Sequence, residues 1–358
     1  MNQTMNDDEK YMARCLQLAR CGRAGAAPNP MVGAVIVADG RIIGEGYHIR
    51  CGEAHAEVNA ISSVQPWDEP LLAQASIYVS LEPCSHYGKT PPCADLIIAR
   101  GIPRVVVGCI DPFSEVAGRG IRKLREAGID VTVGVLEQEC LALNHRFITC
   151  HTEKRPYVIL KWAQSADGFI DRLRTSPDEA PVTFSTRHTA MLVHRQRADV
   201  QAIMVGRRTA LLDNPSLTVR HWPGKSPLRI VIDRELSLPK TLRLFDGSQP
   251  TLVITGCANA PSLPNVEYVA LDFSKDILPQ LLAELYGRRI QSLLVEGGTT
   301  LLQSFIDANL WDEAHVETAP LTLAEGVKAP TLPAGLSKKT LQMDSNRKEI
   351  YYKNQHKD

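Results

Sequence analysis

Apolar and polar stretches alternate along the first half of the chain in a way that predicts short strands between helices. Apolar runs predict strands over 32–38, 41–47, 76–81, 105–110 and 129–133, and helical spacing predicts helices that end near 21, 62, 100, 127 and 149. The turn Asp39-Gly40 joins the first two strands as a hairpin. Asp7 and Asp8 are expected to cap the first helix. Alternating strands and helices indicate a three-layer α/β domain.

The pattern changes after a polar hinge at 150–156, which ends in Pro156. Strands are predicted over 157–162, 202–205, 229–232, 251–255 and 292–295, separated by long irregular connections rich in Pro, Asp and Arg. The charged last residues include an expected edge strand near 350–352. The sequence therefore predicts two α/β domains, residues 1–150 and 151–358, each long enough for its own core.

Charge and cysteine content narrow the choice of partners and compartment. Lys plus Arg and Asp plus Glu are both 40, so the net charge of zero argues against broad nucleic-acid binding, which needs a basic surface. No apolar window predicts a membrane span, and the polar, acidic first eight residues are unlike a secretory signal. The number of cysteines, nine, is odd, and two of them are wanted as metal ligands, so disulfides are not expected. We therefore expect a reducing, cytoplasmic location.

A candidate zinc site is formed by His55, which begins the motif His55-Ala56-Glu57, together with Cys84 and Cys93. One imidazole and two thiolates leave the fourth position of a tetrahedral zinc ion open, which is typical of catalytic sites. An H-x-E motif followed by P-C-x-x-C is the signature of zinc nucleobase deaminases. Here eight residues rather than two separate the two cysteines, and this longer spacing restricts the chain to a smaller group of such deaminases. Glu57 is expected beside the metal, as a proton shuttle rather than a ligand.

The expected local structure supports this site. A buried strand places Cys84 at its carboxyl end, and Cys93 opens a helix whose N-terminal partial positive charge favours a thiolate. His55 and Glu57 can share a site only in the first turn of their helix. The alternatives are ordinary buried cysteines or a structural zinc knuckle, for which His86 is the only nearby fourth ligand. We favour catalytic zinc.

The second half carries weaker signals. No G-x-G-x-x-G follows a strand, so a Rossmann fold has no support. A strand runs into Glu296-Gly297-Gly298 and then a helix, whose free N–H groups could hold a phosphate, although such glycines are often only a turn. Asp and Arg residues gather over 205–220 after a buried strand. An exposed loop with solvated charges is the alternative there, and the residues alone do not decide.

The first half resembles the deaminase domain of the bifunctional riboflavin-biosynthesis deaminase/reductases. The resemblance rests on residues 28–33, 46–48, 55–58, 81–93 and 111–120. The insert S-H-x-G-x-T-P-P-C within this match separates the family from cytidine and guanine deaminases. The second half resembles the attached reductase at 160–161, 165–168, 209–220, 229–233 and 295–298. Nearly the whole chain is covered.

The resemblance implies a fold and a reaction pair. The fold is an N-terminal three-layer α/β/α cytidine-deaminase-like domain followed by a dihydrofolate-reductase-like α/β domain. Zinc-activated water deaminates 2,5-diamino-6-(5-phosphoribosylamino)pyrimidin-4-one. NADPH then reduces the ribosyl side chain, giving 5-amino-6-(5-phosphoribitylamino)uracil. The implied cofactors are Zn²⁺ and NADPH, and the implied assembly is a homodimer through the reductase domain.

Site residues are carried over position by position. In the deaminase half, His55, Cys84 and Cys93 would bind zinc, Glu57 would shuttle protons, and the substrate contacts would be Asn29, His48, His86 and Lys89. In the reductase half, NADPH would contact Ala163, Thr209, Asp213, Gly298, Thr299, Thr300, Leu301, Leu302, Gln303 and Ser304. The substrate would contact Lys161, Arg197, Leu217, Arg220 and Glu296, with the arginines suited to its phosphate.

Some positions depart from the family pattern. Over 171–182 the usual Ser and Trp are missing, so no role is transferred to that loop. Arg234 stands where a serine is common, at the expected NADPH edge. Arg207 and Arg208 are hypothesised to reach the 2′-phosphate of the cofactor.

Two other functions compete with the two-step enzyme. The reductase-like half could be an inactive scaffold on a monofunctional deaminase, but Asp213, Arg220, Glu296 and the glycine pair are retained, which favours activity. A nucleic-acid-editing deaminase would need a basic groove and aromatic stacking positions. Zero net charge and 6% aromatic content argue against it.

Overall fold

The computed structural model describes residues 6–87, 91–111 and 117–353, and the chain divides into two compact units between Glu153 and Lys154. The helices of the first unit are α1 Asp7–Cys21, α2 Ala56–Ser62, α3 Cys93–Ala99, α4 Arg119–Glu126, α5 Glu137–Leu143 and α6 His145–Glu153. Its strands are β1 Gly33–Ala38, β2 Arg41–Tyr47, β3 Ser76–Leu81, β4 Arg104–Cys109 and β5 Asp130–Val133. Each unit is described by itself.

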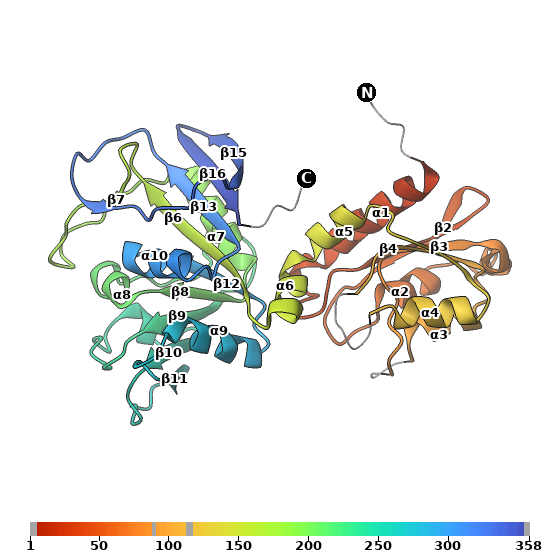
Figure 1. The fold of residues 1–358 in the computed structure, drawn as a ribbon, viewed down its shortest axis with the longest axis horizontal. Helices are drawn as coiled ribbons and strands as arrows, with labels where there is room; N and C mark the ends of the chain where they lie inside the picture. Colours follow the sequence, from red (N-terminus) through yellow and green to blue (C-terminus); the bar gives the residue numbers. More distant parts are fainter. Residues whose placement is uncertain (1–5, 88–90, 112–116, 354–358) are drawn as a thin grey trace. The chain divides into compact units, whose positions relative to one another are not determined.

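A five-stranded sheet, in the order β2-β1-β3-β4-β5, forms the middle layer of the first unit. β1 is antiparallel to β2 and β3, and β3, β4 and β5 are parallel. Helices α2, α3 and α4 pack against one face, and α1 and α5 against the other (Figure 1). The predicted three-layer α/β/α architecture is confirmed. Because parallel strands end at the same sheet edge, the carboxyl end of β3, which leads to Cys84, lies beside the carboxyl end of β4.

The second unit is built on a larger sheet. Its strands are β6 Tyr157–Gln164, β7 Phe169–Asp171, β8 Ala202–Val205, β9 Leu228–Ile232, β10 Thr251–Thr255, β11 Val266–Ala270, β12 Ser292–Glu296, β13 Glu313–Thr318, β14 Val327–Lys328, β15 Ser337–Met343 and β16 Asn346–Tyr352. Its helices are α7 Arg187–Ala198, α8 Arg207–Asp213, α9 Ile277–Gly287 and α10 Thr299–Asp307.

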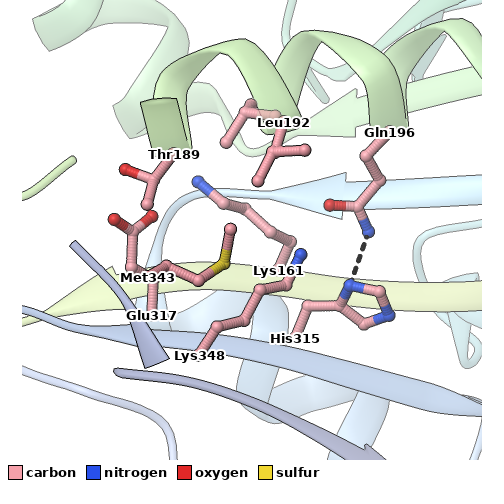
Figure 2. A pocket seen from close by; sticks show the side chains of 9 residues that line it. Lys161, Thr189, Leu192, Gln196, His315, Glu317, Met343 and Lys348 are labelled. Atoms are coloured by element: carbon pink, nitrogen blue, oxygen red, sulfur yellow. Dashed lines mark hydrogen bonds between the residues drawn. The ribbon is translucent and has the colours of Figure 1, made fainter. Parts of the chain in front are cut away.

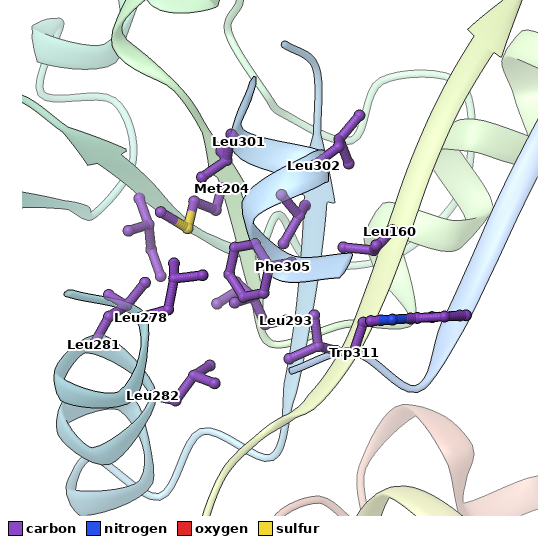
Figure 3. Packing of buried hydrophobic residues seen from close by; sticks show 14 of the residues in the cluster. Leu160, Met204, Leu278, Leu281, Leu282, Leu293, Leu301, Leu302, Phe305 and Trp311 are labelled. Atoms are coloured by element: carbon purple, nitrogen blue, oxygen red, sulfur yellow. The ribbon is translucent and has the colours of Figure 1, made fainter. Parts of the chain in front are cut away.

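Among the described residues, nine strands form this sheet in the order β11-β10-β9-β8-β12-β6-β13-β16-β15. All neighbours from β11 to β13 are parallel, and β16 and β15 add antiparallel strands at one side. Leucines of α9 and α10, with Phe305, cover one face against Met204, Leu293 and Trp311 (Figure 3). The other face packs against α7 and α8. This α/β unit agrees with the predicted fold class.

Several element predictions need correction. The helix expected to end near 149 is two helices, α5 and α6, and the break is at Asn144, whose side chain bonds the backbone N–H and C=O of Met31 at 2.9 Å. Helix α6 also takes up the first residues of the expected hinge. The cap of α1 is Asn6, not Asp7 or Asp8. β16 is not an edge strand, because β15 pairs with its outer side.

None of the helices in the described part of the chain combines the length and the apolar character needed to span a bilayer.

Candidate active sites

The three predicted zinc ligands come together in the first unit. His55 is the N-cap of α2, Cys84 follows β3, and Cys93 is the first residue of α3. Their ligand atoms all lie within 4.8 Å of one another, and His55 Nδ1 lies 3.5 Å from Cys84 Sγ and 3.4 Å from Cys93 Sγ. An imidazole nitrogen and two thiol sulfurs converging on one point fit a zinc ion, with one coordination position left over.

The two cysteines are electrostatically unequal. A hydrogen bond from Cys93, together with His55, lowers the pKa of Cys84 to about 4 despite its burial. The backbone N–H of Cys93, at the start of α3, also donates to Cys84 Sγ at 3.3 Å. The hydrogen bond to Cys84, with burial, raises the pKa of Cys93. These contacts favour the thiolate at Cys84 and the thiol at Cys93, and zinc binding would displace the proton of the thiol.

Glu57 lies in the first turn of α2 and is only 3% exposed. Burial, then the nearby Cys84, raises its pKa to about 7, and its carboxylate is hydrogen-bonded to Cys93. A carboxyl group with a pKa near neutrality can both take up and release a proton at working pH. This position beside the ligand set is the one that the H-x-E spacing predicted.

A pair of polar side chains lies beside the metal ligands. Asn29 Nδ2 is 3.1 Å from His48 Nε2, and His48 Nδ1 is 3.0 Å from the carbonyl oxygen of Ala54. The His48 ring lies edge-on to that of His55, with centroids 5.5 Å apart. Burial lowers the pKa of His48, which favours the neutral imidazole. His86 is exposed, and Lys89 lies outside the described residues.

Glu82 is a structural residue of this site to which the sequence analysis gave no role. It is 6% exposed and its carboxylate accepts hydrogen bonds from the backbone N–H groups of Gly118 at 2.9 Å and Gly120 at 2.8 Å. These bonds fix the start of α4 against the strand end that carries Cys84. The signal available in the sequence was an acidic residue directly after an apolar strand and directly before the Pro-Cys dipeptide.

In the second unit, the glycine pair after β12 packs against α8. Gly297 and Gly298 have φ of +76° and +72°, and a Cβ placed on Gly297 would lie 2.8 Å from Thr209 Cγ2. Gly206, the N-cap of α8, lies close to Leu301. The first turns of α8 and α10 therefore lie together beside a glycine turn, an arrangement that offers backbone N–H groups to a dinucleotide phosphate. Thr209 and Gly298, two of the residues predicted to contact NADPH, therefore lie next to each other.

Other predicted cofactor residues differ in what they can offer. Thr299 and Thr300 begin α10, and the hydroxyl of Thr299 bonds the carbonyl of Lys328. Further along α10, the side chains serve the fold: Leu301 and Leu302 are buried, Ser304 bonds the Leu301 carbonyl, and Gln303 bonds Asp307 and Thr331. Ala163 lies near the end of β6.

Asp213, at the end of α8, is bonded by the guanidinium of Arg174. Arg174 is 5% exposed and also bonds Asp171 at 2.6 Å. It belongs to the loop over 171–182 to which no role was transferred. In this chain that loop holds Asp213 in place, which sequence reasoning did not foresee.

The predicted substrate residues surround an ion pair. Arg197 on α7 binds Glu296 through Nη2 at 2.7 Å and Nε at 3.2 Å, and both side chains are nearly buried. Burial opposes ionisation, but the charges of Arg197 and Lys161 hold the pKa of Glu296 below its ordinary value. Lys161 on β6 lies opposite Glu296 in the register of the neighbouring strand β12.

Lys161 points into a small enclosed space between α7 and the sheet (Figure 2). Lys348 of β16 lines the same space, opposite the helix residues Thr189 and Gln196, and Gln196 bonds His315 at 3.0 Å. Burial and the charge of Lys161 lower the pKa of Lys348. Lys161 is thus held among polar groups beside the Arg197–Glu296 pair.

Arg220 and Leu217 lie on the loop that follows α8. The Leu217 side chain is buried in the core at φ +53°, so only its backbone can meet a ligand. Arg220 is exposed, and its Nη1 donates to the hydroxyls of Ser216 and Thr218. Within the described ranges no carboxylate pairs with it, whereas the charge of Arg197 is already balanced by Glu296.

Arg207, Arg208 and Arg234, the three arginines discussed for the NADPH site, lie in different places. Arg207 donates to Ser237 Oγ at 2.9 Å, beside the end of β9, and remains half exposed. Arg208 donates to the carbonyl of Arg174 at 3.0 Å. Arg234 lies over the ring of Phe273. The contact of Arg207 and Arg208 with a 2′-phosphate, and the place of Arg234 at the NADPH edge, stay predictions.

Comparison with known families assigns each unit. A model described as the cytidine and deoxycytidylate deaminase zinc-binding region matches residues 5–109, and the RibD C-terminal domain matches residues 156–350. A riboflavin biosynthesis protein RibD from Aquifex aeolicus is 40% identical over 324 residues, 89% of each chain. The Escherichia coli K12 protein of the same name is 38% identical over 349 residues, 92% of each chain.

Solved structures agree with these matches. A Thermotoga maritima diaminohydroxyphosphoribosylaminopyrimidine deaminase/5-amino-6-(5-phosphoribosylamino)uracil reductase superposes with a TM-score of 0.87 at 37% identity, covering 97% of this chain and 98% of its own. Acinetobacter baumannii RibD gives a TM-score of 0.83 at 32% identity, covering 98% of this chain and 99% of its own. Both similarities extend over the two units.

Proposed function

Because the chain belongs to the RibD family of riboflavin-biosynthesis proteins, which joins a zinc-dependent deaminase to an NADPH-dependent reductase, we propose that residues 1–150 and 151–358 carry these two activities at separate sites. The enzyme deaminates 2,5-diamino-6-(5-phosphoribosylamino)pyrimidin-4-one and reduces the product to 5-amino-6-(5-phosphoribitylamino)uracil. The convergence of His55, Cys84 and Cys93 beside a buried Glu57 is the observation that carries the first assignment. A scaffold role for the second unit is not favoured.

In the deaminase unit, His55, Cys84 and Cys93 would hold zinc. When bound, zinc lowers the pKa of a water molecule to near neutrality and so supplies the nucleophile for hydrolysis. Glu57 takes a proton from the attacking water, passes it to the pyrimidine nitrogen, and protonates the amine that leaves as ammonia. Asn29 and His48, hydrogen-bonded to each other, would orient the pyrimidine, and His86 and Lys89 are proposed as further substrate contacts.

In the reductase unit, we propose that the turn of Gly297 and Gly298 at the start of α10, packed against Thr209, holds a dinucleotide phosphate through its backbone N–H groups. NADPH supplies the hydride. Asp213, Ala163 and residues 298–304 are proposed to line the cofactor. Arg220 would bind the substrate phosphate. Lys161, Arg197, Glu296 and the Leu217 backbone would orient the ribosyl group, so that its reacting carbon faces the nicotinamide.

Removal of zinc provides the test of this division. Dialysis against a chelator is expected to abolish ammonia release, while reduction of added 5-amino-6-(5-phosphoribosylamino)uracil by NADPH continues. The reason is that the ligand set lies entirely in the first unit. Metal analysis before and after dialysis serves as the control. Loss of both activities together, with the fold retained by circular dichroism, would show that the second unit also depends on the metal.

The proposed assembly is a homodimer through the second unit, and the proposed location is the cytoplasm. A groove of about 440 Å³ beside β6, β13 and β16, lined both by apolar residues such as Leu332 and Leu336 and by the polar Gln164, Lys338 and Glu349, is the surface we propose for this contact. Light scattering should give twice the chain mass of 39.4 kDa. A single-chain mass at micromolar concentration would contradict it. The proposed location rests on the nine cysteines, all of them free thiols, as is usual in a reducing compartment.

A further inference from the structure

A buried histidine of α7, His194, lies directly behind the loop that carries Arg220. We call residues 214–220 the arginine loop. His194 is 5% exposed, and its Nδ1 accepts a hydrogen bond from the backbone N–H of Arg220 at 3.0 Å. No part of the reaction described above uses this side chain. Its contact is therefore with the backbone of the loop rather than with a substrate.

His194 can accept this hydrogen bond only while its Nδ1 carries no proton. Burial, then the charges of Arg197, Arg220 and His221, lower its pKa to about 4, although Glu296 acts in the opposite direction. The ring therefore stays neutral at working pH. A neutral acceptor at this place fixes the loop without adding a third positive charge to the two arginines.

The arginine loop needs such fixing because part of its backbone is in an unfavourable conformation. Leu217 has φ of +53°, which non-glycine residues rarely adopt, and Asn214, a residue type that tolerates this region better, has φ of +41°. Arg197 follows His194 by three residues and therefore lies on the same face of α7. Its guanidinium donates to the carbonyl oxygen of Thr218 at 3.4 Å. One face of α7 thus holds the loop through two backbone groups, Thr218 C=O and Arg220 N–H.

The charge balance explains why the position of Arg220 matters. Glu296 neutralises Arg197 through two hydrogen bonds. Arg220 remains exposed, but partial desolvation, together with the charges of Arg197 and Arg243, lowers its pKa, so its surroundings are locally positive. A dianionic phosphate meeting this surface would be bound by Arg220 in charge-assisted hydrogen bonds, whose strength depends on geometry.

We propose that His194 is the positioning residue that fixes Arg220 for the phosphate of the reductase substrate. This inference rests on the assignment of that phosphate to Arg220 made above. The acceptor at Nδ1 sets the backbone of Arg220, and the backbone sets where the guanidinium can lie. Loss of the acceptor then weakens substrate binding without touching the hydride transfer itself.

The test compares two variants of the full-length, zinc-loaded enzyme. His194→Leu removes the acceptor, and His194→Asn keeps a carbonyl oxygen near the position of Nδ1. The expected result for His194→Leu is a KM for 5-amino-6-(5-phosphoribosylamino)uracil raised about tenfold, the size of one lost buried hydrogen bond, with kcat within about twofold. The inhibition constant of inorganic phosphate should rise in parallel. His194→Asn should retain the wild-type KM within about threefold.

Two internal controls accompany the comparison, namely the deaminase rate of the same chain and the NADPH dissociation constant, and both should be unchanged. If His194→Leu fails to fold, His194→Asn still decides, because a tenfold rise of its KM would overturn the inference. An unchanged KM and phosphate inhibition constant in His194→Leu would also overturn it. Arg220→Gln tests the phosphate assignment separately from the positioning role of His194. An unchanged KM in Arg220→Gln would refute the phosphate assignment. A raised KM in Arg220→Gln, with an unchanged KM in His194→Leu, would refute only the positioning role.

Discussion

Replacing Glu57 with glutamine is expected to lower the deamination rate about a thousandfold, within the range for a positioned general acid–base group. The carboxylate is buried beside the three zinc ligands and has a pKa of about 7, so it can accept and return a proton within one turnover. Glutamine keeps the size and the burial but cannot carry the proton. Zinc content and NADPH-dependent reduction should remain at wild-type levels, since neither depends on this side chain. Ammonia release measured under saturating substrate gives the result.

The matched control is Glu53→Gln, which makes the same chemical change at an exposed position four residues earlier. Its deamination rate should stay within about twofold of the wild type. A Glu57→Gln enzyme that retains more than a tenth of the activity with its zinc in place would mean that another group transfers the proton.

Replacing Gly297 with alanine is expected to abolish most NADPH binding, with a dissociation constant raised about tenfold to a hundredfold. The backbone here has φ of +76°, which costs an L-residue roughly 1–2 kcal/mol. The added Cβ would also lie 2.8 Å from Thr209 Cγ2, so either the glycine turn or α8 must move to make room for it. Titration of NADPH fluorescence measures the effect directly. Deamination should be unchanged, because the substitution lies in the other unit.

Gly287→Ala is the control for this substitution, because a Cβ there meets no atom within 4 Å and its φ is not positive. Its NADPH affinity should equal that of the wild type. Wild-type affinity in Gly297→Ala as well would show that the glycine pair is only a chain turn, which was the alternative left open by the sequence.

The sequence predicted the three-layer first unit well because its elements are short, strongly apolar and bounded by turn residues. It failed where a single side chain decided the local structure. Asn144 breaks one predicted helix in two through its bonds to Met31, a partner 113 residues away. The outer strand β15 has mostly exposed residues and so lacked the apolar pattern that marks a strand.

The zinc ligands were predictable because their chemistry is confined to a short motif with a fixed spacing. The residues that hold the sites in place were not. Glu82 and Arg174 act through backbone groups and through Asp213, contacts that only the folded chain brings together. His194 gave one usable signal, its spacing of three from Arg197 on a helix, but nothing in the sequence shows that it bonds Arg220.

The measurement that tests the account most directly follows product masses when the zinc-loaded enzyme is incubated with 2,5-diamino-6-(5-phosphoribosylamino)pyrimidin-4-one. Without NADPH, we expect release of ammonia and accumulation of the ribosyl aminouracil. Once NADPH is added, this intermediate should be converted to the ribityl product, two hydrogens heavier. Deamination that stops at the ribosyl aminouracil with NADPH present would contradict the account, since the second unit would then be a scaffold.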